Sequence, residues 1–132
     1  LIVEINLKMD NTKTPPKVSW PGFSSSSYDF YQFEITENLS FDKTVTGNYI
    51  FARYAPFDGP NGTYYAVYIG QGLIGERFEA HKRDGCVFRH GATHFLAWLN
   101  NNENSRRAIE SDLLAMHTEA YTPYGCNIRP GG

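Results

Sequence analysis

Several features that would place a chain in a large structural class are missing from this sequence. No apolar run approaches the roughly 20 residues of a membrane-spanning helix. No basic start precedes a continuous apolar stretch, so we expect no secretory signal and a cytoplasmic location. Lysine and arginine number 12 against 14 acidic residues, and the net charge of -2 provides no overall field to attract nucleic acid or an anionic membrane. Positive charge for a polyanionic ligand must therefore be local.

Cysteine is scarce, with Cys86 and Cys126 as the only two. Distant cysteines without a repeated spacing argue against a disulfide framework and a four-cysteine zinc site, so we expect both to be reduced and buried. A metal cluster of Cys86, His90 and His94 is an alternative, because these residues are evenly spaced. Glycines interrupt that stretch, however, and disfavour a continuous helix with all three on one face.

The chain has the size and composition of a single soluble domain, with 132 residues of which 41% are hydrophobic. Residues 2–7 alternate weakly, as in a short strand, and residues 30–35 predict an edge strand. The prolines and serines between positions 15 and 27 are typical of loops. We expect residues 1–46 to be an N-terminal extension that packs on a core domain of residues 47–132.

Two tyrosine-bearing strands are predicted at residues 48–54 and 64–70. The segment between them is dense in glycine, proline, asparagine and aspartate, so the pair is interpreted as a β-hairpin with a long loop. Side chains alternate between the two faces of a strand, and in one register Tyr49 and Tyr68 project from the same face. The sequence alone does not fix that register.

After the predicted hairpin, the apolar residues recur with the spacing of a helix. Residues 74–83 predict a helix with Ile74, Phe78 and His81 on its inner face, Arg77 one turn before His81, and a stop at Gly85. Residues 93–99 are apolar and predict a buried third strand.

A second helix is predicted from the asparagines at 100–102, which offer N-cap oxygens, to about His117. Its core stripe is Ile109, Leu113 and Met116. This spacing puts Glu110 at the boundary of the core rather than on the solvated face.

These motifs resemble those of the GIY-YIG nuclease family over residues 47–127. The matching positions, in chain order, are Gly47-Asn48-Tyr49, Tyr68-Ile69-Gly70, Arg77, His81, Glu110 and Asn127. Asn48 stands where the family usually has an aliphatic residue. The resemblance implies an α+β fold with a small central antiparallel sheet of three or more strands flanked by helices. It also implies a metal-dependent endonuclease that hydrolyses phosphodiester bonds in DNA.

The chemistry of these side chains agrees with that implication. Glu110 can hold Mg²⁺ or Mn²⁺, and Arg77 can offer a bidentate fork to the scissile phosphate. A phenol with a pKa of roughly 10 is a poor base at neutral pH. Arg77 and a nearby metal-bound water could lower that pKa, so Tyr49 is the candidate general base that the resemblance implies. Tyr68 would orient water or phosphate, and His81 would transfer a proton or bind phosphate.

Asn127 would stitch the catalytic strands together by hydrogen bonds. Further candidates for substrate contact are His94, Arg106, Arg107 and His117.

Each residue has a structural alternative when taken alone. Tyrosines are common in half-buried strands, and Glu110 could simply pair with Arg106 one turn before it. Five matching elements in order, with Arg77 and His81 counted as one, make coincidence a poor explanation. Two other functions stay open: a catalytically idle module that binds nucleic acid or a protein, and a nuclease toxin or defence effector. Oligomeric state and substrate specificity are not indicated by the sequence.

Overall fold

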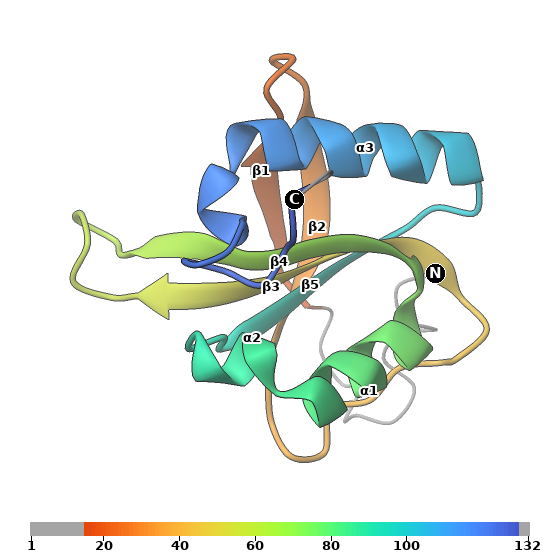
Figure 1. The fold of residues 1–132 in the computed structure, drawn as a ribbon, viewed down its shortest axis with the longest axis horizontal. Coiled ribbons are helices and arrows are strands. Elements are labelled where there is room, and N and C mark those ends of the chain that lie inside the picture. Colours follow the sequence, from red (N-terminus) through yellow and green to blue (C-terminus); the bar gives the residue numbers. More distant parts are fainter. Residues whose placement is uncertain (1–14, 130–132) are drawn as a thin grey trace.

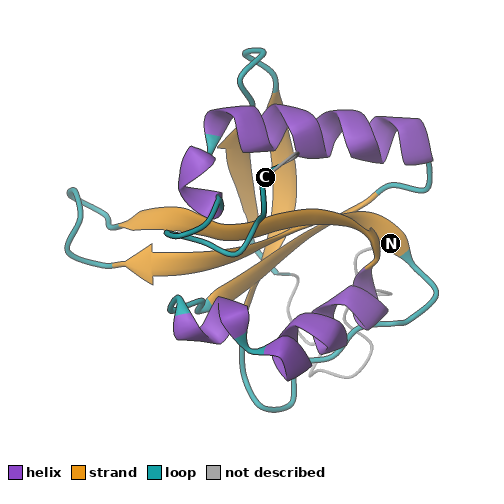
Figure 2. Cartoon of the chain, viewed as in Figure 1, coloured by secondary structure: helices purple, strands orange, loops and turns teal. Residues whose placement is uncertain are grey.

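The computed structural model describes residues 15–129 as an α+β fold built on one curled sheet (Figures 1 and 2). The strands are β1 (Lys17–Pro21), β2 (Ser27–Glu34), β3 (Thr46–Ala55), β4 (Thr63–Leu73) and β5 (His94–Leu99). The helices are α1 (Ile74–Asp84), α2 (Cys86–Arg89) and α3 (Glu103–Met116), followed by the 3-10 helix η2 (Thr118–Ala120). The strand suggested at residues 2–7 lies outside the described residues.

The sheet has the order β1-β2-β5-β3-β4, and every neighbouring pair is antiparallel. The predicted hairpin and third strand are confirmed as β3, β4 and β5. The prediction of an edge position for residues 30–35 is wrong, because β2 lies between β1 and β5. The edge strand on this side of the sheet is β1, which ends at Pro21, and proline is tolerated there since an edge strand needs fewer backbone donors. The described part of residues 1–46 thus adds two strands to the same sheet.

Helices cover both faces of this sheet (Figure 1). Between the sheet and the helices α1 and α2, the core is rich in phenylalanine. Phe51, Phe78 and Phe95 are fully buried there, and their rings contact one another. On the opposite face, Leu113 of α3 packs in a second cluster that includes Ile69. The sheet is therefore buried on both sides, which explains why β5, its central strand, is a continuous apolar run.

The helix boundaries follow the local signals of the sequence. Asn102 caps α3, where its side chain accepts a hydrogen bond from Ser105 N. Gly85 ends α1 in the left-handed conformation with φ 84°. The expectation that Met116 completes the core stripe of α3 is wrong, since this residue is 46% exposed at the last helical position while Leu113 is fully buried.

The C-terminal segment covers the outer edge of β4. A β-bulge shifts the register so that Phe51 lies opposite Tyr68 and Ala52 opposite Ala66, which leaves Val67 without a partner on β3. Val67 O accepts a hydrogen bond from Cys126 N at 2.8 Å instead. The segment thereby protects a strand edge that would otherwise expose unpaired backbone groups.

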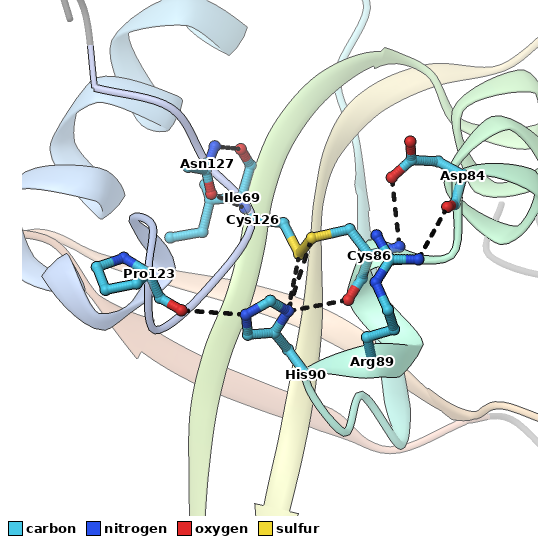
Figure 3. The surroundings of a disulfide bond; sticks show 8 residues. All are labelled: Ile69, Asp84, Cys86, Arg89, His90, Pro123, Cys126 and Asn127. Carbon is cyan, nitrogen blue, oxygen red and sulfur yellow. Dashed lines mark hydrogen bonds between the residues drawn. A yellow bond between two sulfur atoms is a disulfide. The ribbon is translucent and has the colours of Figure 1, made fainter.

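Cys86 and Cys126 form a disulfide bond (Figure 3). The expectation that both thiols are reduced is wrong for this structure. The cause is the path of the chain, because the segment that returns along β4 carries Cys126 to the start of α2 from 40 positions away. No spacing rule in the sequence anticipates a contact that depends on this return.

Among residues 15–129, no helix combines the length and apolar character needed to cross a membrane.

Candidate active site

Tyr49 and Tyr68 project from the same face of the β3–β4 hairpin. Tyr49 lies opposite Gly70 and Phe51 lies opposite Tyr68, so the two tyrosines are diagonal neighbours. Their rings stack with centroids 6.1 Å apart. The register with both tyrosines on one face, which the sequence allowed without fixing, is therefore the one that forms. The phenols differ in burial: Tyr49 is 1% exposed and Tyr68 is half-buried.

Gly70 makes room for this pair. A Cβ at this position would lie 2.5 Å from Tyr49 Oη and 2.9 Å from Tyr68 Cε2. A larger residue would push both rings away, which is a physical reason for glycine after the second tyrosine motif.

His81 of α1 connects the two phenols. Its Nε2 lies 3.0 Å from Tyr49 Oη, and its ring centroid lies 4.2 Å from that of Tyr68. Burial lowers the pKa of His81, and the charge of Arg77 lowers it further against a smaller opposing effect of Asp84. The imidazole is therefore neutral at pH 7 and can accept a proton.

Arg77 supplies an exposed positive charge beside these groups. Its Nε lies 3.0 Å from the position that a Cβ of Gly72 would take, so the guanidinium runs along the bare backbone at the end of β4. It has no hydrogen-bond or ion-pair partner among residues 15–129. Its charge lowers the pKa of Tyr49, Tyr68 and His81. An unpaired guanidinium in this position is available for an anion.

The two phenols are nevertheless not primed as bases. Burial is the largest influence and raises the pKa of Tyr49 far above its ordinary value, and the charge of Arg77 offsets this only in part. Burial also raises the pKa of Tyr68, followed by the charge of Glu110. The hypothesis that Arg77 lowers the pKa of Tyr49 below normal is therefore wrong for the protein alone.

Glu110 of α3 reaches the same region from the other face of the sheet. It is half-buried and lines a cavity of about 560 Å³ together with Tyr68 and Asn127. Burial raises the pKa of its carboxyl, against smaller opposing effects of Arg107 and Arg77. No residue in the range 15–129 donates a hydrogen bond to it or forms an ion pair with it.

The suggested pairing of Glu110 with Arg106 is not formed. Arg106 donates from Nε to Gln71 Oε1 at 2.9 Å and from Nη1 to Asn100 O at 3.1 Å. Arg106 therefore ties α3 to β4 and to the end of β5.

The residues around Glu110 fit a divalent cation. A half-buried carboxylate that lies beside a cavity and accepts no hydrogen bond from the described part of the chain can bind Mg²⁺ or Mn²⁺ that keeps most of its water ligands. One carboxylate is enough when substrate phosphate supplies further oxygens. Glu110 is the residue that would hold such an ion.

Two asparagines hold the backbone around the site in place by hydrogen bonds. Asn127 is buried and accepts from Ile69 N at 2.8 Å while donating to Ile69 O at 2.9 Å, so it acts as a stitch on β4. Asn48, where the sequence departs from the family pattern, is fully buried and donates to Arg106 O at 2.8 Å. The sequence identified Asn48 as a departure, but only the packing of α3 on β3 reveals its partner.

The remaining candidates for substrate contact have structural partners. His117 Nε2 lies 2.7 Å from Pro21 O, and Arg107 forms an exposed ion pair with Glu103 at 2.8 Å. His94 lies 2.8 Å from Thr93 Oγ1 and against the ring of Tyr64. His94 therefore does not complete a metal cluster with the cysteine region.

No protein-family model, no curated protein and no solved structure matches this chain. Any functional assignment therefore depends on the chemistry of its own residues.

Proposed function

We propose that this protein is a metal-dependent endonuclease of the GIY-YIG type that hydrolyses phosphodiester bonds in DNA. The observation that carries the proposal is the grouping of two phenols, a neutral imidazole, a guanidinium and a half-buried carboxylate around the last residues of β4. Neither the guanidinium nor the carboxylate has a hydrogen-bond or ion-pair partner among residues 15–129. Each tyrosine alone has an ordinary structural explanation. A partly buried acid without a donor is costly, however, and such a cost is typical of a binding site.

In this proposal, Glu110 and Arg77 both act on the scissile phosphate. Glu110 would hold a divalent ion, which would supply Lewis-acid stabilisation of charge on the phosphoryl oxygens. Arg77 binds the scissile phosphate through two parallel N–H donors. Because Arg77 has no hydrogen-bond or ion-pair partner to give up among residues 15–129, its charge is available to the phosphate.

Tyr49 and His81 together act as the base. Tyr49 alone is unsuited because burial raises the pKa of its phenol. His81 removes this obstacle: Tyr49 Oη passes its proton to His81 Nε2 over 3.0 Å while it takes a proton from the attacking water. Tyr68 orients that water or the phosphate, and Asn127 keeps β4 in place for both.

Nicking of supercoiled plasmid DNA in the presence of Mg²⁺ or Mn²⁺ tests the proposal. Glu110→Gln is expected to lower the rate by about 10³-fold or more, because several kcal/mol of charge stabilisation are lost and each 1.36 kcal/mol is tenfold. Tyr49→Phe keeps the ring but removes the proton path, and is expected to cost about 10²- to 10⁴-fold.

Matched controls use residues of the same elements outside the site. Glu103→Gln on α3 breaks only an exposed ion pair, and Tyr54→Phe on β3 removes only a hydrogen bond to Asn61 O. Both are expected to nick DNA at the rate of the parent. If Glu110→Gln and Tyr49→Phe also match the parent, the site is not catalytic. A parallel assay on RNA of the same sequence tests the assignment of DNA.

A catalytically idle module that binds nucleic acid is the second candidate. One observation favours it: burial raises the pKa of both phenols, so neither is a ready base. If this candidate is right, the parent protein binds nucleic acid with an affinity that falls as salt rises, and it cleaves none whichever divalent metal ion is added.

A further inference from the structure

A histidine lies directly against the disulfide that joins α2 to the C-terminal segment (Figure 3). His90 Nδ1 is 3.6 Å from Cys86 Sγ and 3.5 Å from Cys126 Sγ. The ligand atoms of the three residues all lie within 4.8 Å of one another, and all three side chains are partly buried. None of the six residues proposed for the nuclease reaction belongs to this group.

The orientation of His90 is set by a backbone carbonyl. Its Nε2 lies 3.1 Å from Pro123 O, and a carbonyl can only accept, so Nε2 carries the proton when it makes this bond. In the neutral ring Nδ1 then has a lone pair, which faces the two sulfurs. Cys86 O, 3.0 Å from Nδ1, competes for a proton on that nitrogen, but a neutral ring can serve only one of the two carbonyls. Histidine ligands of metals are commonly oriented by such a bond from their other nitrogen.

We infer that Cys86, His90 and Cys126 form a zinc-binding site when the disulfide is reduced. A tetrahedral zinc centre has Zn–S bonds of about 2.3 Å and Zn–N bonds of about 2.0–2.1 Å, which gives sulfur–nitrogen edges of about 3.5–3.6 Å. His90 already lies at that distance from both sulfurs. Only the two sulfurs have to separate, to about 3.8 Å. Water or a small thiol takes the fourth position.

The two cross-links exclude each other chemically. A low-molecular-weight thiol reduces the bond in two steps: two RSH give one RSSR, and Cys86 and Cys126 each gain a hydrogen as free thiols. Binding of one Zn²⁺ by the two thiols then releases two protons. The C-terminal segment is thus held to α2 by a covalent bond under oxidising conditions and by zinc under reducing conditions.

This site differs from the one at Glu110 in the metal that it selects. Two thiolates and an imidazole are soft or borderline ligands that suit Zn²⁺, whereas a single carboxylate with water suits Mg²⁺ or Mn²⁺. Cys126 and Glu110 line the same cavity, so the two sites are neighbours. The zinc site does not depend on the proposed nuclease activity.

Cobalt and zinc titrations of the reduced 132-residue chain test the inference. The protein is reduced with a water-soluble phosphine, which is then removed under nitrogen, and Co²⁺ is added as a spectroscopic probe. We expect one equivalent to bind, with sulfur-to-cobalt charge-transfer absorption and the intense visible bands of a tetrahedral ion, and Zn²⁺ to displace it. The oxidised protein is expected to give neither absorption.

Variants identify the ligands. The double variant Cys86→Ser/Cys126→Ser is expected to abolish the charge-transfer band. His90→Ala is expected to weaken zinc binding by at least about 100-fold. Losing a residue that only hydrogen-bonds to a metal ligand costs up to about 100-fold, and losing a ligand itself should cost at least as much. His94→Ala and Glu110→Gln are expected to bind zinc as the parent does. The inference fails if the reduced parent binds no more tightly than the double serine variant, or if His90→Ala binds as tightly as the parent.

Discussion

His81 lies where the buried and the exposed halves of the candidate active site meet. Its Nε2 contacts the buried hydroxyl of Tyr49, while the exposed Arg77 acts on it from one turn away on the same helix. Burial is the larger cause of the lowered pKa of His81, and the charge of Arg77 is the second. The neutrality of the proposed proton acceptor therefore depends partly on one surface residue, and this dependence can be measured without any substrate.

Arg77→Met is expected to raise the pKa of His81 toward its ordinary value of 6.5, whereas Arg77→Lys, which keeps the charge, leaves it low. Since the folded-state pKa lies below the unfolded one, His81 favours folding above pH 6.5 and loses that contribution as the pH falls through the folded-state pKa. Arg77→Met makes this acid loss smaller. NMR titration of the ring protons measures both variants.

His94 serves as the internal reference in that titration, because its pKa is lowered by burial and raised by Glu34, without Arg77. Its titration should not move in either variant. Identical His81 curves for the parent and Arg77→Met would contradict the placement of the guanidinium beside the imidazole.

The positions of single site residues were largely predictable, but their protonation was not. Strand alternation allowed a shared face for Tyr49 and Tyr68 without fixing the register, and helical spacing indicated the boundary position of Glu110. The sequence suggested that a nearby arginine would lower the pKa of Tyr49. Burial by residues distant in the sequence outweighs that arginine, and burial of this kind is a property of the folded packing.

At the scale of elements, the C-terminal segment fixes the strand that carries the second tyrosine motif. Asn127 pairs with both backbone groups of Ile69, and Cys126 N donates to Val67 O. Tyr68 lies between these two attachment points. The segment therefore holds β4 in register at the bulge beside the proposed catalytic phenol.

Asn127→Ala is expected to destabilise the protein by about 2–3 kcal/mol, because two net hydrogen bonds of about 1 kcal/mol each are lost and Ile69 is left with buried unpaired groups. Hydrogen exchange at the amide of Ile69 should accelerate more than exchange in β5. Denaturant unfolding and exchange by NMR measure the two effects. The matched control is Asn101→Ala, an exposed position expected to stay within about 0.5 kcal/mol of the parent.

Elements with strong local signals were predicted, and those defined by their neighbours were not. The hairpin has turn residues, α1 a glycine stop and α3 an asparagine cap, and each is found close to its expected bounds. β1 is short and flanked by prolines, so it resembles a loop until β2 pairs with it. The disulfide likewise depends on the C-terminal segment folding back along β4 to reach α2, and no local sequence pattern encodes that contact.

Over the whole molecule, positively charged side chains are not in excess, but a few of them gather near Arg77. The net charge of -2 excludes an overall electrostatic attraction between the protein and nucleic acid. Arg77 shares a surface depression with Lys43 and Arg83, although Glu76 and Glu79 lie among them. A DNA backbone across the proposed active site would therefore meet only a few cations, and this number can be counted from the dependence of binding on salt.

Binding of duplex DNA is expected to weaken with salt at a slope of about -2 to -3 in a plot of log affinity against log salt, since each neutralised phosphate contributes about -0.9. The measurement uses the Glu110→Gln variant so that no cleavage occurs. Adding Arg77→Met should reduce the slope by about one phosphate contact, because an exposed and unpaired guanidinium is lost. Lys17→Met on the distant edge strand β1 should leave it unchanged, since Lys17 packs over Tyr31 instead. A slope that Arg77→Met does not change would mean that DNA binds elsewhere on the molecule, and the candidate active site would then lose its assigned substrate.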